Sequence, residues 1–455
     1  MNNTKIDIVI VGAGLTGLTI AFYVSKAGFK VKVLEKESRC GGVMQTHVEE
    51  GFTYESGPNT GVVSSTELVE LFDDLGLEFE YPQPEAQARW IWKKGKWHAL
   101  PSGLISAIAT PLFSFKDKIR ILGEPFRRKT DNKNETLAHL VKRRMGKSFL
   151  TYAVDPFISG IYAGDPAKLI TRFAMPKLYA LEQNYGSFIK GTIKKQQEAK
   201  TELEKRVNKN VFSVKGGLGK LIEVLAEKIG NENILTNVEQ LKVMPIDGGF
   251  TSSYSIGDEI FKLESAKVIT TTDAFSFSEL CPFLPGHLVN SLSNISYAKV
   301  LQVAVGYRNW QGIPLPAFGG LVPSIEKKDI LGILFPSSLF TNRAPEGGAL
   351  LSVFMGGVKR PDLFEKSDEE IFKLTRDSLI EMLKTPNEPD FIRVFRYRRA
   401  IPQYDITTEA RLEAIDNIHN MYPGFVIAGN LHNGIGMSDR VKQARQTAYR
   451  ISFQS

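Results

Sequence analysis

The hydrophobic pattern at the start of the chain is typical first of a buried strand, then of a helix, and then of a second strand. Residues 6–11 are β-branched at every position except Asp7, which is typical of a strand buried on both faces of a parallel sheet. Residues 15–27 follow a helical period and stop before a glycine, and residues 31–34 form a second apolar run. This pattern predicts a strand, a helix and a second parallel strand.

The rest of the chain divides into a helical part and parts rich in strands. Basic and apolar residues recur with helical spacing through much of 105–204, where a charged, helix-favouring run at 194–206 ends the region. Alternating runs between 297 and 358 predict a second sheet. The first pattern returns after Val211, with expected strands at 234–238 and 425–428 and a last helix over about 440–449.

Composition places the chain among globular proteins of enzyme size. Its 455 residues suffice for two or three domains, and 42% hydrophobic with 24% charged residues excludes a disordered or collagenous chain. The net charge is +7, and residues 116–147 carry all of it, with 11 basic residues against 4 acidic ones. No aromatic-interleaved basic patch accompanies this excess, so we expect no nucleic-acid partner.

Cysteine count and hydropathy give expectations about the compartment. With only Cys40 and Cys281, we expect neither a disulfide nor a four-ligand metal site, and a reducing, cytoplasmic setting. The apolar run at 6–11 is too short for a secretion signal, and the run at 103–115 falls short of the ~20 residues of a membrane span.

A glycine-rich turn between the first strand and helix predicts a dinucleotide site. The residues that we assign to it are Gly12, Ala13, Gly14, Leu15, Thr16 and Gly17. Gly12 allows the tight turn, Gly14 lets backbone N–H groups approach a pyrophosphate, and Gly17 lets the helix pack on the strand. Glu35 ends the second strand, where it can accept from ribose hydroxyls and repels a 2′-phosphate. The alternative is that these glycines only turn the chain.

Further motifs along the chain resemble those of the amine-oxidase and phytoene-desaturase superfamily of flavoproteins. The matching residues are Lys36, Arg39, Gly41 and Gly42 after the second strand, then Gly57, Pro58, Asn59 and Thr60, then Val238, and finally Gly429, Asn430, Gly436 and Met437. The resemblance implies FAD, with the diphosphate on the first turn, Val238 at the adenine, and the downstream and C-terminal glycines beside the flavin ring and its side chain.

Longer strings resemble the protoporphyrinogen and coproporphyrinogen oxidase family nearly from end to end. They lie at 98–104, 124–126, 154–165, 317–323 and 400–404. The resemblance implies oxidation of a porphyrinogen to a porphyrin in haem biosynthesis, with O2 as acceptor and H2O2 as product. Six electrons leave the substrate, so three flavin cycles are implied.

The same resemblance implies substrate contacts. Gly160 matches the glycine that lets the macrocycle approach flavin N5, and Phe318, Leu321 and Phe354 match positions flanking the substrate rings. From the residues alone, those three are equally well explained as sheet core. No acid–base pair and no metal ligand set is evident. Ile105 stands where some members carry an arginine thought to pair with a propionate, which leaves the substrate anchor unassigned.

These observations predict an α/β fold with a discontinuous Rossmann-type domain, an α+β substrate domain and a helical insertion. The expected FAD-binding domain comprises 1–85, 205–275 and 395–455, the substrate domain 86–98 and 276–394, and the insertion 99–204.

Several alternatives for function and partners stay open. Protoporphyrinogen IX is favoured as substrate because coproporphyrinogen III, with four carboxylates, should require more cations in its pocket. Another flavin oxidase or desaturase and a non-catalytic flavin- or porphyrin-binding protein are the rivals. A homodimer or a haem-pathway chelatase would be a partner. The basic insertion is either a solvated helical face or a surface that attracts anionic lipid at the inner face of the cell membrane, or steers the substrate.

Overall fold

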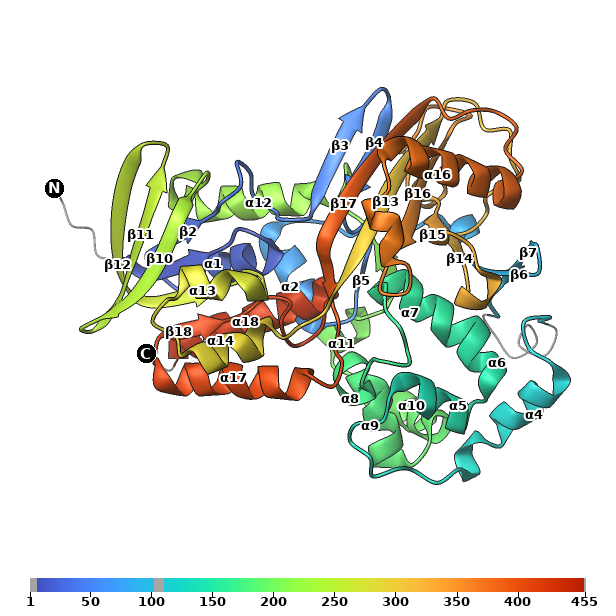
Figure 1. Ribbon diagram of the computed structural model, residues 1–455, viewed down its shortest axis with the longest axis horizontal. Coiled ribbons are helices and arrows are strands. Elements are labelled where there is room, and N and C mark those ends of the chain that lie inside the picture. Colours follow the sequence, from blue (N-terminus) through green and yellow to red (C-terminus); the bar gives the residue numbers. More distant parts are fainter. Residues whose placement is uncertain (1–5, 102–109, 454–455) are drawn as a thin grey trace.

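The chain folds into two large sheets and a helical lobe. The computed structural model describes residues 6–101 and 110–453. Figure 1 shows the first sheet on the left, the second at the upper right and the lobe at the lower right. The α/β class expected from the sequence is confirmed. Ile105 and part of the string at 98–104 lie outside the described residues.

The first sheet carries the predicted strand–helix–strand unit. Its strands are β1 (Ile6–Val11), β2 (Val31–Leu34), β9 (Ile234–Leu235), β10 (Glu239–Ile246), β11 (Gly249–Ile256), β12 (Glu259–Thr270) and β18 (Phe425–Ile427). β1 pairs in parallel with β2 and β12, and β12 pairs in parallel with β18. The antiparallel hairpins of β10, β11 and β12 extend this sheet and were not predicted from the sequence.

Helices cover both faces of the first sheet, as the β-branched run of β1 requires. One face holds α1 (Leu15–Lys26), α2 (Thr66–Leu75), α12 (Gly219–Ile229) and α18 (Met437–Phe453); the other holds α13 (Phe277–Leu280), α14 (Gly286–Ser293) and α17 (Thr408–Met421). Ile8 and Ile10 belong to the first core, whereas Val9 and Val11 belong to the second. Alternate residues of one strand therefore enter two different cores.

The second sheet is mostly antiparallel. Its order is β17 (Phe391–Pro402), β13 (Tyr297–Tyr307), β16 (Ala349–Gly356), β15 (Ile330–Leu334), β14 (Gly319–Leu321), β6 (Arg89–Lys93) and β7 (Lys96–Ala99). One of its faces packs on α16 (Asp368–Leu383). The domain boundary expected at residue 394 falls inside β17, which spans Phe391–Pro402.

A hairpin, a short pair of distant strands and α15 complete the strand-rich parts. The hairpin joins β3 (Gln45–Glu49) to β4 (Phe52–Ser56), and β5 (Gly61–Val62) pairs with the distant β8 (Val211–Phe212). Helix α15 (Pro336–Leu339) lies beside β16.

The helical lobe comprises the described helices between 115 and 206. They are α4 (Phe115–Leu122), α5 (Leu137–Arg144), α6 (Lys147–Phe149), α7 (Asp155–Tyr162), α8 (Thr171–Ala174), α9 (Pro176–Tyr185), α10 (Phe188–Gln197) and α11 (Glu202–Arg206). The run expected to be helical at 194–206 is broken, because Thr201 caps a new helix through Glu204. No helix among residues 6–101 and 110–453 is both long and apolar enough to cross a membrane.

Candidate active site

The first glycine turn closes tightly at both ends and is open in the middle. Gly12 has a φ of +101°, which disfavours any side chain, and a Cβ on Gly17 would lie 2.0 Å from the Gly12 carbonyl oxygen. A Cβ on Gly14 would meet nothing within 4 Å. Helix α1 begins here without a side-chain cap and without an acidic residue in its first turn. Its N–H groups therefore face a space that suits a phosphate.

Glu35 lies at this turn with a buried carboxylate. Its Oε2 accepts from the Ala13 N–H at 2.6 Å, and its Oε1 accepts from the Glu37 N–H at 3.0 Å. A carboxylate has further lone pairs for ribose hydroxyls. Val238 lies on the same side, where its N–H donates to the Glu35 carbonyl oxygen at 2.9 Å, so its own carbonyl is the group that could contact adenine. Lys36 is exposed and lies near Glu37 rather than the turn.

The second glycine turn lies directly against the first. Gly41 pairs with Gly14 and donates its N–H to the Ala13 carbonyl oxygen at 2.8 Å. The Arg39 guanidinium folds over this turn, donating to the Cys40 and Gly42 carbonyl oxygens at 3.0 and 2.8 Å. Two turns that are 27 residues apart in the sequence therefore form one backbone-lined surface.

A third loop, between β4 and β5, is fixed to the second sheet by Gln302. The Gln302 side chain accepts from the Gly57 N–H at 2.7 Å and donates to the Glu55 carbonyl oxygen at 2.7 Å. It is 1% exposed. Pro58, Asn59 and Thr60 continue this loop, and Asn59 donates back to the Gly57 carbonyl oxygen. Gln302 was missed in the sequence, where its only signal is a single amide within the apolar run of β13.

Glu55, which precedes this loop, has a buried carboxylate. It accepts from the Leu218 N–H and from the Thr46 hydroxyl, both at 2.8 Å. Burial raises the pKa of Glu55 to about 7, although these hydrogen bonds favour its charged form. The residue joins the β3–β4 hairpin to the start of α12 and thereby supports the loop.

The C-terminal segment meets the third loop at the start of α18. Gly429 donates its N–H to Gln443 at 2.8 Å, and the Tyr404 hydroxyl lies 3.1 Å from the Asn430 carbonyl oxygen. Gly436 donates to Asp439, and the Met437 methyl lies 2.4 Å from where a Cβ on Gly61 would be. Gly61, which follows the predicted residues 57–60, therefore lies against Met437, the last predicted residue of 429–437, so segments from opposite ends of the chain meet here.

The side chains of the second sheet define a face that looks toward this junction, here named the Leu321 face. Leu321 pairs with Gly332, Gly332 with Phe354, and Phe354 with Gln302 across neighbouring strands. Directly paired residues point to the same side of a sheet, and Gln302 contacts Gly57, so the face points toward the third loop.

Gly160 lies over the Leu321 face. A Cβ on Gly160, in α7, would lie 2.4 Å from Leu321 Cδ2. The structure therefore places Gly160 against Leu321 at one end of this face, while Gln302 on β13, three strands away, holds Gly57 at the other end. Phe318 lies in a separate small cluster with Ala86, Leu339 and Phe340, at the edge of this arrangement.

Arg89 is a cation at that edge which the sequence did not single out. Ile91 pairs with Leu321, and Arg89 lies two residues earlier on β6, so both point to the Leu321 face. The Arg89 guanidinium lies 5.6 Å from the centre of the Phe318 ring. An exposed arginine is a common surface residue, and only this position beside an apolar face makes it a candidate anion contact.

We expect His432 to make the stability of the folded chain depend on pH. Its ring lies 3.2 Å from the Ile427 carbonyl oxygen, and burial lowers the pKa of His432 to about 4. In the unfolded chain the histidine pKa is about 6.5, so between about pH 6.5 and about pH 4 the unfolded chain binds a proton at this residue and the folded chain does not. The free energy of unfolding should therefore fall by up to about 3 kcal/mol as the pH drops from about 6.5 to about 4.

Denaturant titrations of the FAD-loaded protein across this pH window should show a shallower fall for His432→Asn than for the unsubstituted chain. The exposed His287 provides the control, and His287→Asn should leave the slope unchanged. Parallel curves for His432→Asn and the unsubstituted chain would contradict this assignment.

The geometry fits a flavin dinucleotide: an open glycine turn at a helix start, a carboxylate beside it, and two glycine loops that converge on an apolar face. Residues 15–452 match the family described as "Flavin containing amine oxidoreductase". "Protoporphyrinogen oxidase 1, chloroplastic" from Arabidopsis thaliana is 31% identical over 98% of this chain and 88% of its own length. "Coproporphyrinogen III oxidase" from Bacillus subtilis is 25% identical over 98% of this chain and 97% of its own.

A crystal structure of a protein from Exiguobacterium sp. 255-15 superposes with a TM-score of 0.82, at 22% identity, over 99% of this chain and 100% of that one. This likeness concerns the fold. Because the family match spans almost all described elements of both sheets and the lobe, the chain belongs to the flavin containing amine oxidoreductases and is an FAD-dependent oxidoreductase.

Proposed function

We propose that the chain oxidises a porphyrinogen to a porphyrin in haem biosynthesis, with protoporphyrinogen IX as the first candidate substrate. The observation that carries this proposal is the junction at Gln302, where the third glycine loop is fastened to an apolar sheet face lying under Gly160. Relatives named as protoporphyrinogen and coproporphyrinogen oxidases align along nearly the whole chain, which supports the same substrate class.

The residues of the junction suit a wide apolar macrocycle with carboxylate arms. Leu321 and Phe354 offer apolar surface, and Gly332 between them contributes no side chain. Gly160 would let a ring carbon come close to the cofactor because it has no side chain there. The glycine loops at 12–17, 41–42 and 57–60 would hold FAD, which when bound would supply two-electron oxidation with O2 as acceptor and H2O2 as product; loss of six electrons needs three such rounds. The protein's part is to orient the substrate and to hold the third loop in register through Gln302.

Arg89 is proposed to bind a substrate carboxylate at the edge of the Leu321 face. Arg89→Ala should raise KM about tenfold with little change in kcat, because one charge-assisted hydrogen bond away from the reacting atoms is lost. Steady-state kinetics with FAD-loaded protein measure this split, and Arg89→Lys should recover part of the loss. Arg376→Ala, on α16 behind the sheet, is the control with an equal charge change. An unchanged KM for Arg89→Ala would remove Arg89 from the site.

The direct test is to purify the flavin-loaded protein and add protoporphyrinogen IX and coproporphyrinogen III separately while porphyrin fluorescence is followed. Faster oxidation of protoporphyrinogen IX supports the proposal as stated. Preference for coproporphyrinogen III, the substrate in the Bacillus subtilis relative's name, would keep the reaction and replace the substrate. Flavin-loaded protein that oxidises neither would overturn the proposed function.

A further inference from the structure

Helix α7 has two sides that pack on different parts of the molecule. Ile158 and Tyr162, one turn apart, lie in the apolar core of the helical lobe. Gly160 lies between them in sequence and therefore on the opposite side of the helix, where a Cβ would lie 2.4 Å from Leu321 Cδ2. Figure 1 shows α7 between the second sheet and the rest of the lobe. The position of α7 therefore sets how close Gly160 comes to the Leu321 face.

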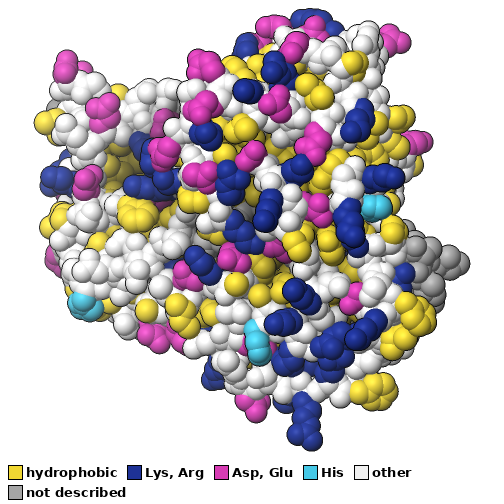
Figure 2. All heavy atoms as spheres, turned by 45° about the vertical axis from the view of Figure 1, so that its right-hand side comes forward, with side chains coloured by type: hydrophobic (Ala, Val, Ile, Leu, Met, Phe, Trp, Pro, Cys, Tyr) yellow, Lys and Arg dark blue, Asp and Glu magenta, His cyan; other side chains and the backbone are white. Residues whose placement is uncertain are grey.

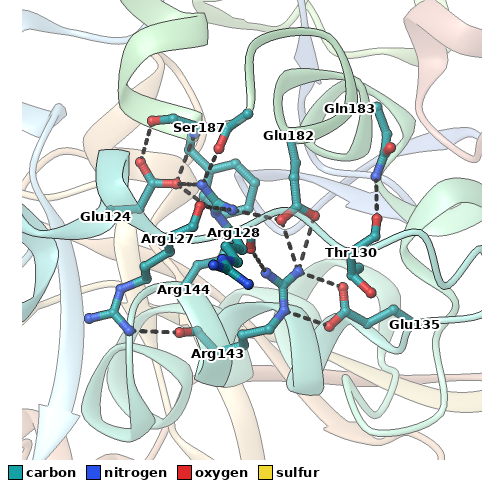
Figure 3. Close-up of polar contacts among 12 residues, drawn as sticks. Glu124, Arg127, Arg128, Thr130, Glu135, Arg143, Arg144, Glu182, Gln183 and Ser187 are labelled. Carbon is teal, nitrogen blue, oxygen red and sulfur yellow. Dashed lines mark hydrogen bonds and ion pairs between the residues drawn. The ribbon is translucent and has the colours of Figure 1, made fainter.

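The lobe behind α7 is held together by buried ion pairs. Arg144 is fully buried and pairs with Glu124 and Glu182 at 2.5 and 2.7 Å (Figure 3). Arg143 pairs with Glu135 and Glu182 at 2.8 and 2.9 Å. These pairs fix α5, α9 and the segment at Glu124 relative to one another, because removing one partner would leave a buried charge uncompensated. The lobe is therefore fixed internally, and its position over the Leu321 face depends on its contacts with the second sheet.

Asp155 attaches the start of α7 to two loops of the second sheet. Its carboxylate accepts from the Ser324 N–H at 2.7 Å, from the Ser324 hydroxyl at 3.1 Å and from the Lys359 ammonium. Lys359 also donates to the Ser324 hydroxyl at 2.9 Å and lies 3.9 Å from an oxygen of Asp165. Ser324 follows β14 and Lys359 follows β16. These four residues, named the Asp155 clamp, join three separate segments of the chain.

Burial and charge distinguish the Asp155 clamp from an ordinary surface ion pair. Exposed pairs contribute little to stability, but Asp155 is only 8% exposed and also accepts from a backbone N–H. Figure 2 shows Lys and Arg side chains gathered on the lobe, at the lower right. A cation of the second sheet would be repelled by such a surface. Asp155 and Asp165 supply the acidic groups that let Lys359 bind there.

The two ends of α7 are attached differently. Before its start, Leu150–Val154 form a π-helical turn, and Pro156 has no N–H to donate to the preceding turn. At its end, Ala163 has a φ of +46°, and its carbonyl oxygen accepts from the Val358 N–H at 2.9 Å. Loss of the Asp155 clamp would therefore release the start of α7 and leave its end on the second sheet.

We propose that Asp155 and Lys359 are positioning residues for the oxidation. Their ion pair holds the start of α7 at the distance from the sheet at which Gly160 contacts Leu321, and it thereby sets how closely the substrate approaches the cofactor. This inference rests on the proposed function, because it assigns the space beside Gly160 to the substrate. The two residues act through α7 and are not assigned a contact with substrate or cofactor.

Steady-state kinetics of the full FAD-loaded chain test this role. Asp155→Asn and Lys359→Met should each lower kcat for porphyrin formation about tenfold, with KM and FAD content little changed, because misplaced reacting atoms slow the chemical step. The double variant should lose no more than either single variant, because each change already breaks the same pair. Lys359→Arg should recover part of the loss. Lys328→Met is the matched control, since Lys328 pairs with Glu381 at 2.5 Å and its side chain is 30% exposed, against 27% for Lys359.

Hydrogen exchange followed by mass spectrometry tests the attachment of α7 without turnover. Backbone amides of residues 155–162 should exchange at least about tenfold faster in Asp155→Asn than in the unsubstituted chain or in Lys328→Met. Unchanged exchange would show that the clamp does not hold α7.

Other results would also overturn the positioning role. Faster exchange with an unchanged kcat would reduce the clamp to a structural contact, and losses of kcat that multiply in the double variant would assign the two residues to independent roles. Loss of FAD in both single variants would assign the pair to the stability of the fold. An unsubstituted chain that oxidises no porphyrinogen would overturn the proposed function and the positioning role together, and the exchange result would then still show whether the clamp holds α7.

Discussion

Replacing Gly14 with valine should give a folded protein that retains little or no FAD. The backbone of Gly14 has a φ of −73°, which any residue adopts, and a Cβ there meets no protein atom within 4 Å. The valine side chain would therefore not disturb the protein itself. It would fill the space beside the first turn of α1 that a pyrophosphate needs. Flavin absorbance of the purified protein, relative to its concentration, measures the retained FAD.

Gly286 provides a matched control for this substitution. It is the first residue of α14, and a Cβ there also meets nothing within 4 Å. Gly286→Val should therefore keep full FAD occupancy and a similar thermal midpoint. A Gly14→Val protein with normal FAD content would show that the pyrophosphate does not bind at the first turn. A Gly14→Val protein that fails to fold would contradict the premise that a side chain at this position meets no protein atom.

Gly160→Ala should leave FAD in place and lower kcat/KM about a hundredfold. The new methyl group would lie 2.4 Å from Leu321 Cδ2, the far end of a flexible side chain, so the fold can adjust by turning Leu321 aside. The new methyl group and the displaced Leu321 side chain would then both occupy the face where the substrate is proposed to lie. Misplacement of reacting atoms by about 1 Å can cost about a hundredfold in rate. Porphyrin formation, normalised to bound flavin, measures the effect.

Gly191→Ala is the matched control, because it creates the same kind of contact in α10. A Cβ on Gly191 would lie 2.8 Å from Leu181 Cδ2, far from the Leu321 face. It should leave kcat/KM unchanged, whatever small stability it costs. Equal activity of Gly160→Ala and the unsubstituted chain would show that Gly160 does not border the substrate. A parallel loss of flavin would instead place Gly160 in cofactor binding.

The sequence revealed the parts of the site whose function depends on local backbone geometry. The turn from Gly12 to Gly17 can be recognised from a short run of residues. The positive φ at Gly12 and the close helix packing at Gly17 favour glycine at these fixed positions. The strand–helix–strand pattern around it is equally local. The family resemblance then identified the later glycine loops by their order along the chain, but it did not tell how far apart they lie in space.

Other features could not be read from the sequence because they arise from pairing between distant strands. Gln302 is a single amide in an apolar run. It becomes important only because its Oε1 accepts from the Gly57 N–H at 2.7 Å, although the two residues are 245 positions apart in the sequence. Arg89 became a candidate only when strand register placed it opposite Gly319, two residues from the pair of Ile91 and Leu321 and on the same face. The charge of +7 in residues 116–147 was visible at once, but burial decides which cations pair internally and which face solvent.

By itself, the sequence determined the glycine turn between β1 and α1, the α/β class and the presence of a basic, largely helical region. These follow from periodicity and from conformations that few residue types can adopt. Only the tertiary structure decided that the third glycine loop is fastened to the Leu321 face through Gln302, and that Arg144 is fully buried between Glu124 and Glu182. Burial and cross-strand pairing are properties of contacts between distant segments, and no local pattern encodes them.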